Sequence, residues 1–271
     1  MMPKSVQEPS RLFVGKTLEV LKWSISGAED TIVLIHEALG SAGYWKNFPA
    51  LLAESTCVNV LAYSRAGHGE SDGPLEPRSD EYYHRQVEEV LPALLEEHRI
   101  VSPILYGHSE GAAIAFLYAA AGCPVKAIIA ESPIVLPGKD TLQTVEEMNN
   151  GLRRAELIDK LGRYHRNAGS VFDSWVEGVR SHLAARTFSA AEYLPRIACP
   201  VLVIEGALDP FSGQAQQAVL KTGIRHLRTI VLENTGHLPH REQPQMVLEC
   251  VRGFLTEPLE AQREALVRHN C

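Results

Sequence analysis

Six short apolar runs that alternate with helical patterns constrain the fold of this chain more than any other feature of its sequence. They are TIVLIH (31–36), CVNVLAY (57–63), SPILYG (102–107), VKAIIAE (125–131), PVLVIEG (200–206) and LRTIVLE (227–233). Strands buried on both faces of a parallel sheet have this composition, whereas strands with one solvent face alternate with polar residues. The pattern predicts an α/β fold with a mostly parallel, twisted sheet flanked by helices. Ahead of it, KTLEVLKWSISG indicates an antiparallel edge hairpin.

Helical periodicity fills the segments between these runs. In residues 80–98, apolar side chains recur at steps of three and four behind Asp80, a candidate cap for the start of a helix. Pro92 should kink or shorten that helix, because proline lacks the backbone N–H that an interior turn needs.

The alternation stops between residues 134 and 195, which hold helical patterns and no convincing strand. We expect this insertion to form a helical cap over one end of the sheet, with residues 1–133 and 196–271 forming the core. The alternative is a helical pair that only thickens the core. The segment after Pro258 is predicted to be a solvated helix that leaves a partner contact open.

Charge and composition narrow the classes of ligand. The chain of 271 residues carries 26 basic and 33 acidic residues, and its Lys and Arg are scattered, so neither nucleic acid nor a membrane surface is an expected partner. A small-molecule substrate is expected instead, and the sequence leaves a homodimer open. Five widely spaced cysteines without a CxxC pair are typical of reduced thiols. With no apolar signal region at the N-terminus, these features favour a cytoplasmic protein.

The stretch Gly107-His108-Ser109-Glu110-Gly111 lies where an apolar run gives way to a helical pattern. An abrupt turn from a parallel strand into a helix forces strained backbone angles on the residue at its apex, and glycines on both sides relieve the clash. This is the arrangement of a nucleophile elbow, which exposes a serine hydroxyl at the carboxyl edge of the sheet. Ser109 is therefore the candidate nucleophile.

A serine hydroxyl needs a base to take its proton, and the base needs an acid to orient it. Later strand ends supply both, with Asp209 in VLVIEGALDPF and His237 in VLENTGHLPH. His240 is the alternative candidate for the base, and Glu131 is the alternative candidate for the acid. His108, although next to the serine, should point away from it at the elbow.

Acyl chemistry also needs two backbone N–H groups for the developing oxyanion. Glu110 follows the nucleophile and offers one, and the loop HEALGS after the first core run offers the other at Ala38. HEALGS does not form a zinc motif, because HExxH would require histidine where Gly40 stands. No metal and no cofactor is expected.

Taken together, five segments of the sequence resemble the α/β-hydrolase superfamily, in the lidded branch of esterases, thioesterases, lactonases and carbon–carbon bond hydrolases. They are HEALGS, YSRAGHGESD, GHSEGA, ALDP and TGHLPHREQP. The resemblance implies a catalytic triad of Ser109, Asp209 and His237, with Ala38 and Glu110 as oxyanion donors. It also implies that the insertion at 134–195 is a substrate cap.

Two departures from the family pattern stand out. Glu37 replaces the usual glycine of the oxyanion loop, and Tyr63 and Ser64 stand ahead of Arg65 where an aspartate is usual. A carboxylate facing the oxyanion would oppose its charge, so we expect Glu37 to turn outward, toward Arg65 or Lys46. Glu110, next to the nucleophile, is expected to be solvated or paired, or else to meet a cationic or polar group of the substrate.

The leading hypothesis for function is a serine hydrolase that cleaves an ester, thioester or lactone of a small or medium carboxylic acid through an acyl-enzyme. Carbon–carbon bond hydrolysis of a ring-fission product or a β-diketone would use the same triad, and a hydrolase-like binding protein is the alternative that is not an enzyme. Candidate walls of the substrate pocket are Tyr44, Trp45, Met148, Phe172 and Trp175.

Overall fold

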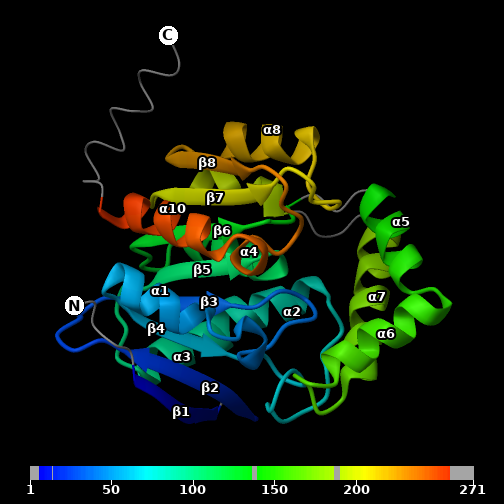
Figure 1. Ribbon diagram of the computed structural model, residues 1–271, viewed down its shortest axis with the longest axis horizontal. Helices are drawn as coiled ribbons and strands as arrows, with labels where there is room; N and C mark the ends of the chain where they lie inside the picture. The colour runs from blue at the N-terminus through cyan, green and yellow to red at the C-terminus, as the bar shows by residue number, and fades with distance from the viewer. Residues whose placement is uncertain (1–5, 14, 136–138, 186–189, 257–271) are drawn as a thin grey trace.

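An eight-stranded sheet forms the centre of the molecule in the computed structural model, which describes residues 6–13, 15–135, 139–185 and 190–256 (Figure 1). Its order is β1-β2-β4-β3-β5-β6-β7-β8, and every pairing from β4 to β8 is parallel. The strands are β1 (Val6–Phe13), β2 (Thr17–Ser24), β3 (Thr31–Ile35), β4 (Asn59–Tyr63), β5 (Ile104–His108), β6 (Ala127–Glu131), β7 (Val201–Gly206) and β8 (Leu227–Leu232). The expected α/β fold is confirmed.

Helices cover both faces of this sheet. One face carries α1 (Phe48–Thr56) and α10 (Pro244–Thr256), and the other carries α3 (Leu91–Glu97), α4 (Glu110–Ala120) and α8 (Gln214–Gly223). Within β3, Ile32 and Leu34 pack against the first group while Val33 and Ile35 pack against the second. Because successive side chains of a strand point to opposite faces, two covered faces require the apolar runs seen in the sequence.

The predicted hairpin lies at one edge of the sheet. β1 and β2 pair in antiparallel fashion, and β2 continues antiparallel onto β4. At the opposite edge, most of the side chains of β8 are only partly buried, because no further strand covers it.

The predicted helix over residues 80–98 is divided. It begins as α2 (Asp80–Arg85), passes through a π-helical turn η2 (Gln86–Val90) and continues as α3, in whose first turn Pro92 lies. Proline has no N–H to donate to the preceding turn, and the π-helical turn that lies directly before it interrupts the regular α-helical hydrogen bonding at this point. The cap of the first segment is Ser79, whose hydroxyl accepts the N–H of Tyr82, rather than Asp80.

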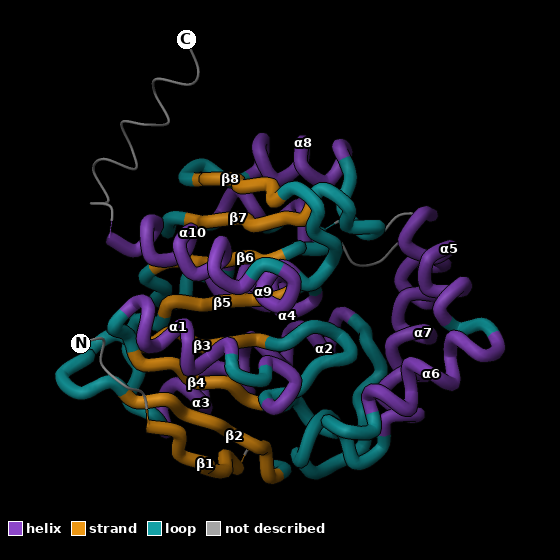
Figure 2. Tube along the Cα trace, viewed as in Figure 1, coloured by secondary structure: helices purple, strands orange, loops and turns teal. Residues whose placement is uncertain are grey.

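Between β6 and β7 the chain leaves the sheet and forms α5 (Lys139–Met148), α6 (Gly151–Leu161) and α7 (Ala168–Ala185). These three helices lie together at one end of the sheet (Figure 2). They share a small apolar cluster that includes Val145, Leu161 and Phe172, separate from the two clusters on the faces of the sheet. The short turns η3 (Ala190–Glu192) and η4 (Leu194–Arg196) pack back on the core. The division into core and cap at residues 134 and 195 stays a prediction.

Several other expectations concern termini and thiols. Cys57, Cys123, Cys199 and Cys250 are free thiols, whereas Cys271 and the helix expected after Pro258 lie outside the described residues. Among the helices that the structure describes, none combines the length and the apolar character needed to cross a bilayer.

Candidate active site

Ser109 occupies a sharp corner between β5, which ends at His108, and α4, which begins at Glu110. Its backbone adopts φ 53° and ψ −113°, a conformation that residues other than glycine rarely adopt. The Ser109 N–H donates to the carbonyl of Glu131 on the neighbouring strand β6, 2.9 Å away. The corner is therefore fixed by the sheet itself.

The two glycines of the elbow are required by close backbone contacts. A Cβ on Gly107 would lie 2.4 Å from the carbonyl oxygen of Gly111, and a Cβ on Gly111 would lie 2.0 Å from the carbonyl oxygen of Ile35. Since these neighbours are backbone atoms, no rotation of a side chain can relieve the overlap. The local sequence thus permits α4 to start directly against β3 and β5.

Asp209 and His237 come from the loops after β7 and β8, which are neighbouring parallel strands. Their side chains meet, with 2.8 Å between Asp209 Oδ2 and His237 Nδ1. Gly206 allows the two loops to approach, because a Cβ there would lie 2.2 Å from the carbonyl oxygen of Gly236. The loop after β7 is held further by a hydrogen bond from Leu208 N–H to the carbonyl of Thr235.

Asp209 is set up to remain ionised. Burial by itself would raise the pKa of this carboxyl, but the bond to the His237 ring and the N–H of Phe211 outweigh burial and hold the pKa below its usual value. An ionised carboxylate at Nδ1 favours the tautomer in which Nδ1 carries the hydrogen and Nε2 is free to accept a proton.

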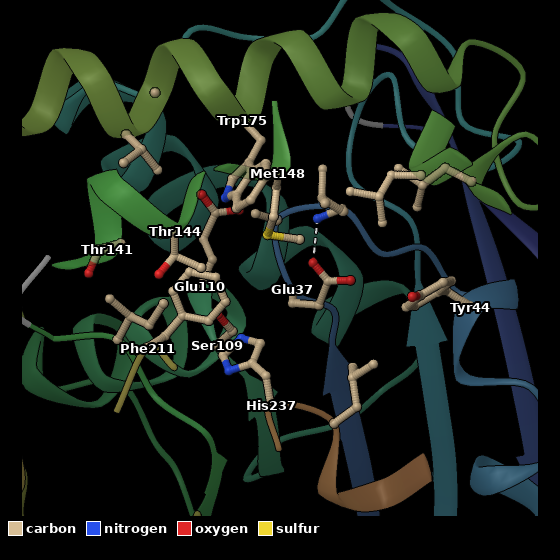
Figure 3. Close-up of a pocket in the computed structure, with 18 of the residues that line it drawn as sticks. Glu37, Tyr44, Ser109, Glu110, Thr141, Thr144, Met148, Trp175, Phe211 and His237 are labelled. Carbon is tan, nitrogen blue, oxygen red and sulfur yellow. Dashed lines mark hydrogen bonds between the residues drawn. The ribbon is translucent and has the colours of Figure 1, made fainter. Parts of the chain in front are cut away.

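Ser109 and His237 both line a cavity of about 820 Å³ between the edge of the sheet and helices α5–α7. Figure 3 shows their side chains next to each other at the base of this cavity. The structure therefore brings together the three residues that the sequence singled out. Asp209 is bonded to His237, and His237 lines the cavity together with Ser109.

The alternative acid and base form a separate pair. His240 Nδ1 lies 2.7 Å from Glu131 Oε1, and the other carboxylate oxygen of Glu131 accepts the hydroxyl of Tyr106 at 2.5 Å. Both residues are buried, and neither lines the cavity. His108 also points away from Ser109, with its Nε2 2.7 Å from the backbone carbonyl of His237.

The loop after β3 reaches the same cavity through Ala38. The Ala38 carbonyl accepts a hydrogen bond from Arg78 at 2.8 Å, and His68 Nε2 lies 3.2 Å from the same oxygen. On the other side, Glu110 is the first residue of α4, and the N–H groups of a first helical turn have no intrahelical acceptor. Ala38 and Glu110 thus both place backbone groups beside the nucleophile.

The Glu110 side chain is neutralised by two buried arginines. Its carboxylate lies 2.7 Å from Arg65 and 2.8 Å from Arg78, and it also accepts the hydroxyl of Tyr83. Burial alone would raise the pKa of Glu110, but Arg78 and Arg65 lower it to about 2. The group of two cations and one anion leaves a net positive charge next to the elbow.

Arg78 also connects the core to helix α7 of the insertion. Besides Glu110 and Ala38, its guanidinium donates to the hydroxyl of Ser174 on α7, 2.7 Å away. Gly178, one turn further along α7, leaves room for this side chain, since a Cβ there would lie 2.8 Å from Arg78 Cδ. No sequence motif points to Arg78, because its partners are between 32 and 96 residues away.

The expectation that Glu37 turns outward is wrong. Glu37 lines the cavity, and its carboxylate accepts the N–H of Leu39 in its own loop (Figure 3). Arg65 is committed to Glu110 and reaches only the backbone carbonyl of Glu37, 2.9 Å away. Burial raises the pKa of the Glu37 carboxyl above its usual value, because an ionised carboxylate is poorly solvated there.

Three of the five expected pocket residues line the cavity, namely Tyr44, Met148 and Trp175. Trp45 does not line it, because it packs in the core against Phe48 and the ring of His240. Phe172 is fully buried among the helices of the insertion and makes no part of the wall. Phe211, which the sequence analysis missed, does line the cavity and packs edge-on against His237, with 4.7 Å between ring centroids.

In the segments that the structure describes, no group of three or more His, Cys, Asp or Glu side chains is arranged to hold a metal ion.

Known proteins share this architecture. Mouse (Mus musculus) monoglyceride lipase is 24% identical to the chain, over 91% of this chain and 89% of the lipase. Among solved structures, the enol-lactonase from Burkholderia xenovorans LB400 superposes with a TM-score of 0.73 at 19% identity, covering 92% of this chain and 100% of the lactonase. The 2-hydroxy-6-oxo-6-phenylhexa-2,4-dienoate hydrolase from Rhodococcus sp. strain RHA1 gives 0.72 at 18% identity, covering 92% and 99%.

A known protein family also matches most of the chain. The sequence model of the Alpha/beta hydrolase family matches residues 32–249, which run from β3 into α10 and include the elbow and both loops that meet it. The chain belongs to the alpha/beta hydrolase family.

Proposed function

We propose that the protein is a serine hydrolase that cleaves an ester, thioester or lactone of a small or medium carboxylic acid. The observation that carries this proposal is the hydrogen bond of Asp209 to His237, whose side chain lines the same cavity as Ser109. A base with its orienting acid next to a hydroxyl that lines a cavity is the arrangement that nucleophilic acyl transfer requires.

In the first half of the reaction, the Ser109 oxygen attacks the carbonyl carbon of the substrate while His237 Nε2 takes the hydroxyl proton. The tetrahedral intermediate collapses when the bond to the leaving group breaks, and His237 returns the proton to the departing oxygen or sulfur. In the second half, His237 takes a proton from water as the water oxygen attacks the acyl carbon, and it returns that proton to the Ser109 oxygen when the bond between this oxygen and the acyl carbon breaks, which releases the carboxylic acid. Asp209 stabilises the imidazolium in both halves without itself being protonated.

Backbone N–H groups of Ala38 and Glu110 are the proposed donors to the oxyanion. Arg65 donates to the carbonyl of Glu37, which lies in the same peptide group as the Ala38 N–H, and so orients this donor, while Arg78 holds the following peptide through the Ala38 carbonyl. The net positive charge of Arg65, Arg78 and Glu110 supports the developing negative charge from the side of α4. Fixed donors of this kind contribute several kcal/mol to barrier lowering in acyl transfer, about 3 kcal/mol for each donor.

The proposal is tested with p-nitrophenyl butyrate and with a fluorophosphonate probe. The wild-type protein should hydrolyse the ester and be labelled by the probe, and Ser109→Ala should lose both while keeping its circular dichroism spectrum. Loss of about 10⁴-fold or more in kcat is expected, because the nucleophile acts as a unit with its base. An Ser109→Ala variant as active as the wild type would refute the role of the elbow.

Hydrolysis of a carbon–carbon bond is the second candidate, because the same three residues would serve it and the Rhodococcus hydrolase shares the fold. A panel of acyl esters, lactones and ring-fission dienones separates the two reactions. Faster turnover of a dienone than of any ester would favour the second. A binding protein would turn over none of them and would resist the fluorophosphonate.

A further inference from the structure

Basic side chains are concentrated around the cavity. The chain as a whole has an excess of seven acidic residues over basic ones, yet six of the cavity-lining residues are basic and three are acidic. Two of the charged residues, Arg78 and Glu110, are bonded to each other. The remaining basic residues are Lys46, Arg153, Lys160, Arg163 and Arg241.

These cations come from both sides of the opening. Arg153 and Lys160 are seven residues apart on α6, so they lie on the same helical face as Leu157, which also lines the cavity. Lys46 and Arg241 come from the core, after η1 (Gly43–Trp45) and from α9 (Pro239–Glu242) respectively. The cavity is therefore bordered by positive charge on the core side and on the side of the insertion.

Among the residues that the structure describes, these five cations have no ion-pair partner. Arg241 donates instead to the backbone carbonyl of Tyr44, and its guanidinium lies 3.9 Å from the centre of the Tyr44 ring. Its buried Nε has no hydrogen-bond acceptor in the described parts of the chain. Unpaired cations beside a cavity remain available to an anion.

The backbone of Lys46 gives an independent indication. It adopts φ 56° and ψ −124°, close to the strained conformation of Ser109 itself. Glycine would adopt these angles without strain, so a lysine here costs stability of a kind found at functional sites. The strained residue is also an exposed cation at the opening.

The cationic side chains lie closer to solvent than the nucleophile does. Ser109 is buried, whereas Lys46, Arg153, Lys160 and Arg163 are exposed. A substrate whose carbonyl reaches Ser109 would place a group several atoms away among these cations. The two acidic residues that could oppose them are Glu37, whose carboxylate is bonded within its own loop, and Glu147, which is bonded to Gln143.

We propose that the outer part of this cavity is a subsite for an anionic group, a carboxylate or a phosphate, carried by the substrate at a distance from the bond that is cleaved. This inference rests on the proposed function and adds a substrate class to it. The anion could belong to the acyl part, as in a half-ester of a dicarboxylic acid, or to the leaving group, as in a thioester of a phosphorylated thiol. In both cases a carboxylate or phosphate group of the substrate would lie near several exposed cations of the protein.

Two pairs of substrates distinguish these sources. Mono-p-nitrophenyl glutarate is compared with p-nitrophenyl butyrate for an anion on the acyl part, and butyryl-coenzyme A with butyryl-pantetheine for an anion on the leaving group. We expect kcat/KM of the wild-type protein to be at least tenfold higher for the anionic member of one pair. That preference should weaken as ionic strength rises, because exposed charges are screened within about 8 Å at 0.15 M salt.

The variant Lys160→Ala/Arg163→Ala should lower the preference for the anionic member about tenfold. Its matched control is Arg225→Ala/Arg252→Ala, which removes two exposed cations that do not line the cavity, and this control should keep the wild-type preference. The inference is overturned if neither pair shows a preference, or if the control variant loses it equally.

Binding to Ser109→Ala, measured by isothermal titration calorimetry, separates failure of the subsite from failure of the proposed function. Binding of mono-p-nitrophenyl glutarate or butyryl-coenzyme A that is at least tenfold tighter than that of its neutral partner would support the subsite even if the wild-type protein turned over neither. Equal binding within both pairs would overturn the subsite, while turnover of p-nitrophenyl butyrate by the wild-type protein would still support a serine hydrolase.

Discussion

The imidazole of His108 donates a hydrogen bond to the backbone carbonyl of His237, with 2.7 Å between Nε2 and the oxygen. A carbonyl can only accept, so the hydrogen of the ring is on Nε2. Burial, the largest influence on this ring, lowers the pKa of His108 to about 3, and the ring is therefore neutral at physiological pH. Because His108 directly precedes Ser109, this bond ties the elbow to the loop of the proposed base.

The first prediction concerns the hydrogen bond between His108 and the carbonyl of His237. His108→Asn should lower kcat about tenfold or more, because the shorter side chain cannot reach the carbonyl and a shift of about 1 Å in a catalytic group can cost up to 10²-fold. Measuring kcat and KM for p-nitrophenyl butyrate should place most of the loss in kcat. His84→Asn is the matched control, since His84 is exposed on α2. An unchanged kcat in a folded His108→Asn protein would show that the bond does not position His237.

The elbow and the two loops that meet it could be predicted from the sequence, because they depend on a short local motif and on the order of the strands. The glycines around Ser109 encode the turn in five residues, and parallel strands bring their carboxyl ends to one edge, so the loops after β7 and β8 had to approach it. The triad roles of Ser109, Asp209 and His237 remain predictions that the experiments above test. What the structure adds is that Asp209 and His237 are hydrogen-bonded and that Ser109 lines the same cavity as His237.

Other parts of the site depend on contacts that the sequence does not display. Aromatic residues at helical spacing look alike whether they face a cavity or a core, and the sequence therefore did not distinguish Trp175, which lines the cavity, from Trp45 and Phe172, which do not. The partner of Glu110 was equally hidden, because Arg65 and Arg78 arrive from loops far along the chain. Arg65 is occupied in this way, and the Glu37 carboxylate is bonded within its own loop rather than to a cation.

The second prediction concerns Glu37. Its pKa is raised by burial, so the carboxyl is neutral at acidic pH and becomes ionised as pH rises through that pKa. An ionised Glu37 beside the oxyanion opposes the developing charge, whereas Glu37→Gln stays neutral and keeps an oxygen for the Leu39 N–H. The ratio of kcat/KM for Glu37→Gln to that of the wild type should be near one at the acidic end and rise several-fold with pH. A ratio that is independent of pH would contradict this account.

The third prediction concerns the link that Arg78 makes to α7. Arg78→Ala leaves Glu110 with a single arginine and frees Ser174 and the Ala38 carbonyl, so we expect a loss of about 3–5 kcal/mol in the free energy of unfolding and a lower kcat. Urea denaturation measures the first effect. Glu110→Gln serves as the matched partner in a double-mutant cycle, and a coupling energy near zero would mean that the Arg78–Glu110 pair contributes nothing.

The fourth prediction concerns acid stability. Arg78 and Arg65 offset the effect of burial and lower the folded-state pKa of Glu110 to about 2, from a usual value of 4.5. Between these values the unfolded state binds more protons, so stability is full above about pH 4.5 and is lost as pH falls through about 2. The contribution of this group is on the order of 3 kcal/mol. Glu110→Gln should be less stable at neutral pH and lose less stability on acidification, as measured by urea titrations from pH 6 to 3. A parallel decline in the two proteins would contradict the assignment.

The fifth prediction concerns the backbone contact at the elbow. Gly111→Ala would place a methyl group 2.0 Å from the carbonyl oxygen of Ile35, and neither backbone can move without separating α4 from β3. We expect a loss of more than about 3 kcal/mol in stability, together with loss of fluorophosphonate labelling, because overpacking against fixed atoms displaces the nucleophile. Gly253→Ala is the matched control. Gly253 lies in α10 with no atom within 4 Å of an added Cβ, so alanine there should stabilise the helix by about 0.5–1 kcal/mol. If Gly111→Ala were tolerated as well as Gly253→Ala, then the close approach of α4 to β3 would not be what holds Ser109 in its strained conformation.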